Sequence, residues 1–491
     1  MSAAASFKRR AYLALPFVGL VFIVLALMVF ESDYLYRIQE QSLFLNTPLF
    51  FRQCMVVSGG LLSWAGAFLT QFFYHPALGA CLLCLCWAVL VLLLMVTFRI
   101  PSRWAVVALI PVVLLLLTDV TLGYWIFYLK LRGYFYVGTL GTIIAVALTW
   151  FYRWLSGISI KLSAAFIPLA VLFGYPLFGF YALLAALLMA VLSWHIVRSR
   201  VAWVTNILAL MSVLLVPLIY YHTLYHETNL VNIYWTALPV FHVYKDYYNA
   251  YLLPYILLVV SLCAMAVFPI RSDRQLMGTW KQHLPYGLFF LLVVATISFW
   301  YKDGNFHREL RMSRAIDRQD WEGVLAIAAE SNAEPTRAIC LMRNLALFRL
   351  GRQGDGMYRY PNGSVSPAAP FPVRLVQTEG KMLYFQYGLI NSCYRWCIED
   401  GVEYGWNVSH LKYLVKCSLF NNELKAAQKF ISILRKTRYY GDWCGKYEAY
   451  VRYFPLAAND PELGPIVPIF MSDDYLASDN GDMEDFMNLN K

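Results

Sequence analysis

The sequence predicts an all-α protein with a polytopic membrane helical bundle over residues 1–300, a soluble α-helical-repeat domain over 301–472 and a mobile acidic tail over 473–491. Three observations predict this fold class. Only 14% of the 491 residues are charged, against about 25% in soluble chains, and the mean hydropathy is +0.53. Residues 1–300 hold 17 Lys and Arg but 7 Asp and Glu, whereas residues 301–491 hold 23 of each. Near residue 302 the pattern changes from long apolar runs to amphipathic helices.

The membrane bundle is predicted from apolar stretches of about 20 residues, the length that crosses a hydrocarbon layer. We expect about nine spans, within 11–30, 78–98, 104–120, 134–150, 163–197, 203–221, 251–268 and 287–300. Of these, 163–197 is read as a hairpin of two short spans that turns at the Gly/Pro break over 174–179. The apolar segment 55–74 is interrupted by Ser58, Gly59, Gly60 and Gly66, so we expect it to be re-entrant or interfacial.

The distribution of basic residues orients this bundle, because Lys and Arg accumulate on the cytoplasmic side. If residues 55–74 do not cross, 12 of the 17 bases lie on the inner side, with only Asp273 among the acids. The sequence therefore predicts a multi-pass protein of the bacterial inner membrane, with a cytoplasmic N-terminus and the C-terminal domain outside. The first apolar run is too long for a signal peptide and lacks a cleavage site, so we expect it to remain as an anchor.

Under this topology nearly all carboxylates of the membrane half lie in three outer loops. Glu31 and Asp33 follow the first span at positions i and i+2, where they can meet a lipid head group. The loop continues to Arg52 with interleaved aromatic residues, which is typical of a helix in the interface. Any single acid can also be an ordinary hydrated loop residue. Their concentration on one face favours a functional role.

This acidic motif, the long first outer loop and the many spans resemble the GT-C superfamily of polytopic glycosyltransferases over the N-terminal part of the chain. The resemblance implies a sugar donor on a polyprenyl phosphate, with Asp33 or Glu31 as the catalytic acid/base and the other as a helper or metal ligand. Many GT-C enzymes carry two adjacent acids, whereas Ser32 separates them here. The resemblance therefore leaves open which of the two acts.

The chemistry of such a site also needs positive charge. A carboxylate would activate an acceptor hydroxyl as a general base. Basic side chains near the lipid head group would neutralise the leaving phosphate, and a divalent metal ion held by carboxylates could share this work. The candidates for phosphate or head-group binding are Arg37, Arg52, Lys130, Arg132 and Lys245.

The third outer loop carries a second group of candidate ligands: His222, His226, Glu227, His242 and Asp246. If the loop is helical, two pairs in it share a face at spacing i, i+4, which suits metal binding. Neither pair matches a closed motif such as H-E-x-x-H. Interfacial histidines beside Tyr and Trp, without any metal, are the alternative.

The C-terminal domain is predicted from helical-hairpin patterns. Residues 344–352 resemble the first helix of a tetratricopeptide (TPR) repeat, and residues 419–430 resemble the turn and second helix of another. Stacked hairpins offer a concave surface to a protein partner. As a whole, the chain resembles an uncharacterised bacterial multi-pass membrane family with a TPR-like C-terminal tail, for which no activity is established.

Two functions follow from these patterns. One is a GT-C-like glycosyltransferase that uses a lipid-linked sugar at the outer face of the membrane. The other is a non-enzymatic, membrane-anchored scaffold or assembly protein whose TPR-like domain binds a partner in the cell envelope. A transporter ranks lower, because no inverted repeat of broken helices is visible. Nucleic-acid binding is excluded, because the bases of the membrane half are topogenic and the soluble half is neutral.

Overall fold

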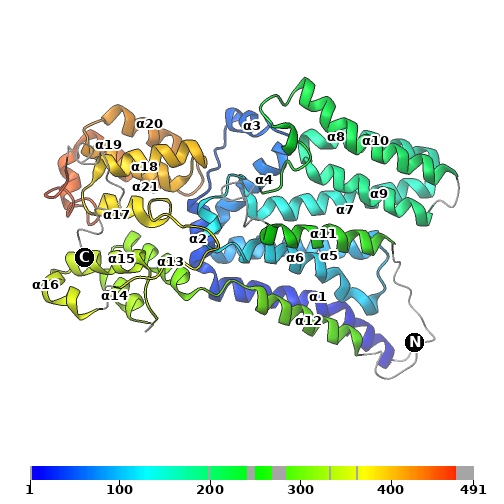
Figure 1. Ribbon diagram of the computed structural model, residues 1–491, viewed down its shortest axis with the longest axis horizontal. Coiled ribbons are helices and arrows are strands. Elements are labelled where there is room, and N and C mark those ends of the chain that lie inside the picture. The colour runs from blue at the N-terminus through cyan, green and yellow to red at the C-terminus, as the bar shows by residue number, and fades with distance from the viewer. Residues whose placement is uncertain are drawn as a thin grey trace.

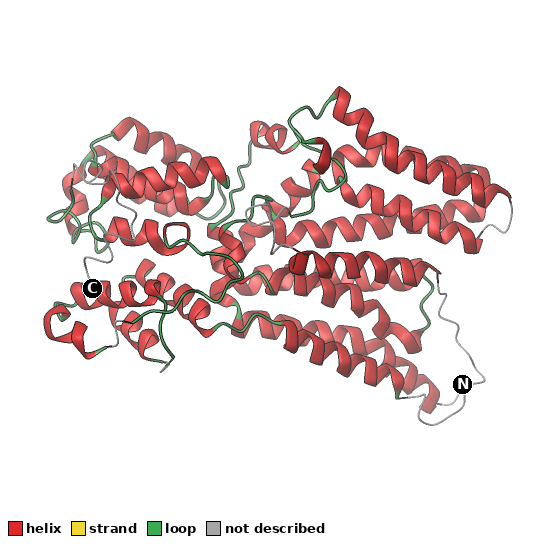
Figure 2. Cartoon of the chain, viewed as in Figure 1, coloured by secondary structure: helices red, strands yellow, loops and turns green. Residues whose placement is uncertain are grey.

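The computed structural model describes residues 3–196, 200–239, 249–267, 283–330, 333–360 and 363–471. Within these residues the chain is helical, apart from two isolated bridge pairings, Thr336 with Val365 and Leu389 with Met471. Figure 1 shows two parts along the long axis, a bundle of long helices and a cluster of shorter ones. Figure 2 shows the same all-helical architecture without a sheet in the described residues. The predicted all-α class is confirmed.

The bundle contains the long apolar helices of the N-terminal half: α1 (Ala3–Phe30), α5 (Pro76–Thr97), α6 (Leu109–Val120), α7 (Tyr134–Ile158), α8 (Ile160–Phe178), α9 (Phe180–Ile196), α10 (Arg200–Thr223), α11 (Asn249–Val267) and α12 (Leu284–Phe299). A 3-10 turn over Ser102–Ala108 precedes α6. Six helices are long and apolar enough to cross a membrane, and a seventh candidate is α12 with α13 (Gly304–Asp317), bent by 71°. α9 and the apolar part of α11 are shorter. The chain is thus a multi-pass membrane protein with six to seven candidate spans, and the count of nine stays a prediction.

The interrupted apolar segment over 55–74 contains a short helix that packs against α7 and α8. α4 (Gly60–Thr70) has 11 residues and is followed by a 3-10 turn over Gln71–Tyr74. At 1.5 Å per residue it extends roughly 16 Å, about half of a hydrocarbon layer. Gly59 has φ 80°, and a Cβ there would lie 2.6 Å from that of Ala237, so this turn needs glycine.

The predicted hairpin over 163–197 is formed by α8 and α9. α8 ends at Phe178, α9 begins at Phe180, and Gly179 between them has φ 55°. The backbone N–H of Phe180 donates to the carbonyl of Thr236 at 3.0 Å. The chain therefore reverses within the predicted Gly/Pro break, where the loop after α10 covers it.

The C-terminal half contains α13 and the shorter helices α14 (Trp321–Ala329), α15 (Arg337–Arg349), α16 (Gln353–Gly356), α17 (Lys381–Gln386), α18 (Ile390–Glu403), α19 (Val408–Phe420), α20 (Leu424–Leu434) and α21 (Gly441–Arg452). Side chains of Asp320, Thr336 and Asn407 cap α14, α15 and α19 by accepting backbone N–H groups. Helices adjacent in sequence pack together, as α13 with α14 and α18 with α19. The resemblance to TPR repeats stays a prediction, and the acidic tail over 473–491 lies outside the described residues.

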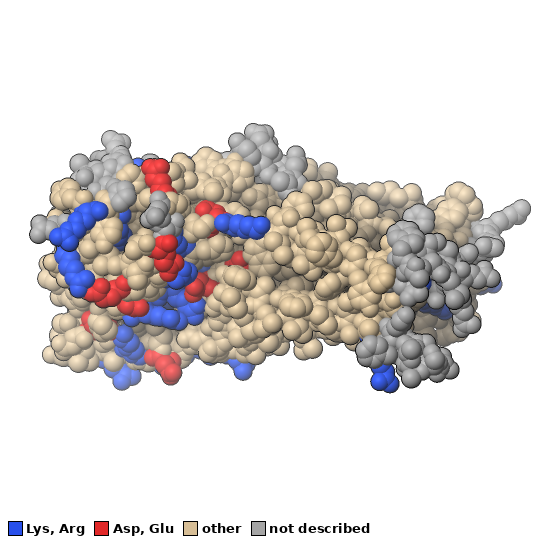
Figure 3. Space-filling model, turned by 90° about the horizontal axis from the view of Figure 1, so that it is seen from below, with Lys and Arg blue, Asp and Glu red and all other residues tan. Residues whose placement is uncertain are grey.

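The two halves differ in surface charge and contact each other extensively. On the face seen in Figure 3, acidic and basic side chains gather over the C-terminal half, while the middle of the bundle is uncharged. Phe371 from the loop after α16 is buried against Trp125 and Tyr128, with ring centroids 4.3 and 5.2 Å apart. The loop that joins α16 to α17 therefore packs on the membrane half.

Candidate functional site at the domain junction

The predicted acidic motif lies at the start of α2 (Ser32–Glu40), a short helix between the two halves. Its apolar side chains, such as Leu35 and Ile38, are buried, and the Tyr34 hydroxyl donates to the carbonyl of Asp119 in α6 at 2.7 Å. α2 contacts α5 of the bundle and α13 and α19 of the C-terminal half. The segment that follows the first long helix therefore lies at the junction of the two halves.

Glu31, immediately before α2, is buried at 3% exposure. Its carboxylate accepts a hydrogen bond from Trp300 Nε1 at 2.6 Å and lies 3.8 Å from Nδ1 of His307. Burial raises the pKa of Glu31, while His307 and the Trp300 hydrogen bond oppose that shift. Trp300, directly after α12, and His307 in α13 thus cover this carboxylate.

Asp33, the second acid of the motif, is partly exposed and forms an ion pair with Arg314 of α13. The Arg314 guanidinium also lies over the Tyr36 ring, 4.7 Å from its centroid. Glu31 and Asp33 therefore both meet the start of the C-terminal half, but each has its own partner. Neither lines the pockets described below.

Arg37, a predicted phosphate-binding residue, is buried in an ion-pair network. Its guanidinium lies 2.8 Å from the Glu379 carboxylate and 3.5 Å from Glu40, and it donates to the carbonyl of Thr378 at 3.3 Å. Burial alone lowers the pKa of Arg37, but Glu379 and Glu40 raise it above its ordinary value. The Lys412 ammonium lies 3.0 Å from the other oxygen of Glu40.

The pKa of Glu40 also shifts so that the charged form is favoured. Burial raises the pKa of this carboxyl, but Lys412 and Arg37 outweigh burial and hold the pKa below its usual range. These charges therefore satisfy one another across the junction. Arg37 is buried, faces Glu379 and Glu40, and lines neither of the two pockets.

The structure adds a buried acid that the sequence reading did not select. Glu309 in α13 is 3% exposed and accepts hydrogen bonds from the hydroxyls of Tyr124, at 2.9 Å, and Thr336. Burial raises the pKa of Glu309 to about 8, although both hydrogen bonds lower it. In sequence it stands among the charges Arg308 and Arg311, a pattern typical of a solvated helix face, so no local signal marks it.

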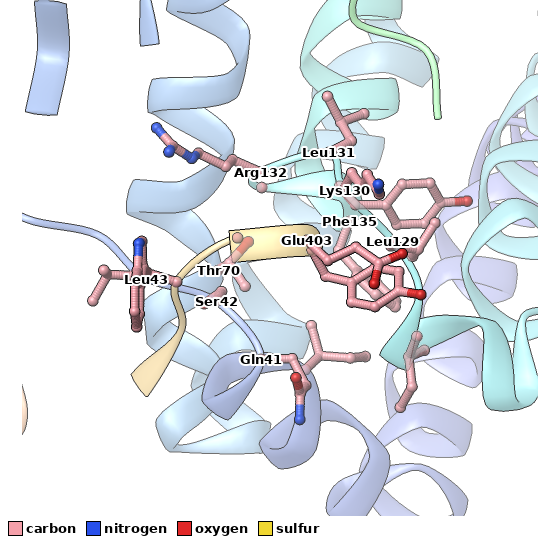
Figure 4. Close-up of a pocket in the computed structure, with 17 residues that line it drawn as sticks. Gln41, Ser42, Leu43, Thr70, Leu129, Lys130, Leu131, Arg132, Phe135 and Glu403 are labelled. Carbon is pink, nitrogen blue, oxygen red and sulfur yellow. The ribbon is translucent and has the colours of Figure 1, made fainter. Parts of the chain in front are cut away.

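A pocket of about 280 Å³ lies beside α2, between the loop that precedes α7 and the α18–α19 connection. Figure 4 shows Lys130 and Glu403 on one side of it, with Arg132 pointing away. The Lys130 ammonium lies 5.2 Å from the Tyr404 ring centroid, and the Arg132 guanidinium lies 5.4 Å from that of Phe50. Neither base forms an ion pair with a carboxylate of the described residues. Two of the five predicted head-group residues thus line one pocket.

The other predicted head-group residues are not part of this pocket. Arg52 is exposed on α3 (Pro48–Cys54), and Lys245 lies outside the described residues. The predicted phosphate-binding set is therefore divided: Arg37 is buried in the junction, Lys130 and Arg132 line the pocket, and Arg52 is open to the surroundings.

The predicted metal ligands of the third outer loop are exposed where they are described. α10 ends at Thr223, so His222 is helical while His226 and Glu227 follow in an irregular turn. His222 and His226 therefore do not share a helix face. His242 and Asp246 lie outside the described residues. Among the residues that the structure covers, no group of three or more His, Cys, Asp or Glu could hold a metal ion.

Comparison with known proteins identifies a family for this chain but no activity. No curated protein and no solved structure matches the chain. One family model, described as a family of unknown function (DUF6057), matches residues 6–490. Because this match covers nearly the whole chain, the protein belongs to the DUF6057 family, whose function is unknown.

Proposed function

We propose that the protein is a membrane-anchored scaffold of the bacterial inner membrane, whose helical C-terminal half binds a partner in the cell envelope. The observation that carries this proposal is that the carboxylates at the two ends of α2 already have partners in the structure. Glu31, Asp33 and Glu40 are all engaged by Trp300 or by residues of the C-terminal half. A general base must reach the hydroxyl that it activates, and these carboxylates instead fix one domain on the other. The TPR-like hairpins would then present a surface at a fixed position relative to the bilayer.

We infer nine spans, a cytoplasmic N-terminus and an outer C-terminal half. The support is the arrangement of helix ends. Arg153 near the end of α7 donates to the carbonyl of Thr97 at the end of α5, and Arg99 follows directly. These bases lie at the end of the bundle that also holds the chain start (Figure 1), as the rule for cytoplasmic bases requires.

A GT-C-like transferase that uses a lipid-linked sugar is the second candidate. The observation that favours it is the pocket beside α2, where Lys130 and Arg132 have no carboxylate partner in the described residues and Glu403 supplies an acid. In this alternative Asp33 would leave Arg314 to act as the base. A divalent ion would have to come with the substrate or be held by residues outside those described.

Charge reversal at the Asp33–Arg314 pair separates the two candidates. We expect Asp33→Arg and Arg314→Asp each to impair complementation of a deletion strain, because each places two like charges together at the junction. In the double variant the pair is restored with opposite polarity. A scaffold then recovers function, whereas an enzyme that needs the Asp33 carboxylate stays inactive.

The matched control is Arg395→Asp, since Arg395 pairs with Glu399 on the exposed surface of α18, 2.7 Å apart. This variant should complement fully, and immunoblots should show equal membrane levels for all variants. Failure of the double variant at normal protein level, with a functional control, would rule out the scaffold assignment and favour the transferase.

A further inference from the structure

A second pocket, of about 270 Å³, lies on the other side of the first outer loop. Its walls come from the loop after α2, from α4 with the following turn, and from the α20–α21 connection. The lining residues are Phe44, Asn46, Trp64, Phe68, Gln71 and the run Lys436 to Arg438. The backbone N–H of Asn46 donates to the carbonyl of Lys436 at 3.4 Å, so the membrane half and the C-terminal half are joined at this pocket.

One wall of this pocket is aromatic. The rings of Trp64 and Phe68, one helical turn apart on α4, are stacked with an interplanar angle of 10°. The ring of Phe44 meets both of them edge-on, with centroids 5.6 and 5.3 Å apart. These rings form an apolar surface against which a carbon skeleton can pack.

The opposite wall is polar and positively charged. Lys436 and Arg438 are exposed and form no ion pair among the described residues, whereas the neighbouring Arg435 lies 2.8 Å from Glu448. Gln71 lines this pocket and is only 7% exposed. The side-chain amide of Gln71 can donate a hydrogen bond to hydroxyl or phosphate oxygens of a ligand in this pocket.

The pocket also adjoins an apolar surface of α3. Phe51 contacts the Trp64 ring edge-on at 5.7 Å and is 39% exposed, and Leu49 beside it is 65% exposed. Exposed apolar residues on a short helix next to membrane spans are typical of contact with the acyl region of a bilayer. A ligand in this pocket therefore meets positive charge at one end and an apolar surface at the other.

We propose that this pocket binds one anionic phospholipid with a hydroxylated head group, such as phosphatidylglycerol. Lys436 and Arg438 would face the phosphate, Asn46 and Gln71 the head-group hydroxyls, and the α3 surface the start of the acyl chains. The lipid thereby bridges the bundle and the C-terminal half. This proposal holds whichever function the C-terminal half performs.

Native mass spectrometry of the full-length protein in detergent tests it, with phosphatidylglycerol, phosphatidic acid and phosphatidylcholine as probes. We expect tighter binding of phosphatidylglycerol than of phosphatidylcholine. The double variant Lys436→Gln/Arg438→Gln should bind phosphatidylglycerol roughly 30-fold more weakly, which is about 2 kcal/mol for two basic residues. Gln71→Leu should weaken phosphatidylglycerol binding about fivefold and leave phosphatidic acid, which lacks the head-group hydroxyls, unchanged.

The matched control is Lys425→Gln/Lys429→Gln, which removes the same charge from exposed positions of α20 outside the pocket. This control should bind as the wild type does. Equal losses in the two double variants would mean attraction by net charge alone and would overturn the proposal. Competition by soluble glycerol 3-phosphate as strong as that by the lipid would also overturn it, because the pocket would then take free polyol phosphates.

Discussion

Basic side chains at the domain junction have two contrasting environments. Around α2, Arg37, Arg314 and Lys412 each face a carboxylate across the boundary between the halves. At the rims of the two neighbouring pockets, four bases face no carboxylate of the described residues: Lys130, Arg132, Lys436 and Arg438. The first group forms ion pairs between the halves. In the second group, Lys130, Arg132 and Arg438 lie over aromatic rings and have no carboxylate to neutralise them among the described residues.

This contrast changes how the acidic motif is interpreted. Acids at the exit of a first span are compatible with catalysis or with docking, and the sequence pattern is the same in both cases. What separates the cases is the partner: an acid buried against a cation is a structural contact, while an unpaired cation in a pocket is available for binding.

Removal of the Glu379 carboxylate should lower the free energy of unfolding more than any other change proposed for the junction. Glu379→Ala leaves Arg37 buried, with only Glu40 at 3.5 Å to balance it, and also removes the acceptor of the Ser313 hydroxyl. Breaking a buried ion pair from one side costs about 3–5 kcal/mol. We expect a loss of this size in the free energy of unfolding, measured by denaturant titration in detergent.

A double variant distinguishes charge from shape at this position. Arg37→Met/Glu379→Leu removes both charges while keeping side-chain volume, and such replacements are often neutral. It should recover most of the stability lost in Glu379→Ala. A loss below about 1 kcal/mol in the single variant would contradict the view that this network holds the halves together.

The stability of the junction should also fall as the pH rises. Glu309 has a pKa of about 8 in the folded protein, against an ordinary value of 4.5, so the folded state binds a proton that the unfolded state has released. Its stabilising effect is complete below pH 4.5 and is lost as the pH rises through about 8. Asp317, with its pKa raised by burial to about 6, acts in the same direction at lower pH.

Measurement above about pH 6.5 avoids the titration of His410, because burial lowers the pKa of that side chain. There we expect stability to fall by up to about 1.4 kcal/mol per pH unit until Glu309 is ionised. Glu309→Gln, which stays neutral, should remove this slope. An unchanged slope in that variant would assign the pH dependence to other groups.

The sequence predicted the helical class and the long apolar helices, because both depend on local patterns. Apolar runs locate the long helices, and the change of period near residue 302 locates the second half. The turn at Gly179 fell inside the break predicted from its Gly and Pro residues. The acidic motif was also correctly placed at the end of the first long helix.

The partners of that motif could not be predicted, because they are distant along the chain. Arg314 lies 281 residues after Asp33, and Glu379 lies 342 residues after Arg37. Helix periodicity carries no information over such separations. For the same reason the sequence could not show that Lys130 and Arg132 share a pocket with Glu403, or that Gln71 lines a second pocket with Lys436 and Arg438.

The smallest change in the free energy of unfolding is expected on removal of junction bases that have no carboxylate partner among the described residues. Lys130→Gln/Arg132→Gln removes two exposed charges whose described contacts are with the rings of Tyr404 and Phe50 and, for Arg132, with Cys54 Sγ at 3.8 Å. Exposed contacts of this kind contribute roughly 0.5–1 kcal/mol each at most, and loss of repulsion from the other bases offsets part of that. We therefore expect the free energy of unfolding to change by less than about 1 kcal/mol, measured beside Glu379→Ala under the same conditions. A loss as large as that of Glu379→Ala would show that these bases also hold the domains, and the division between docking charges and binding charges would then fail.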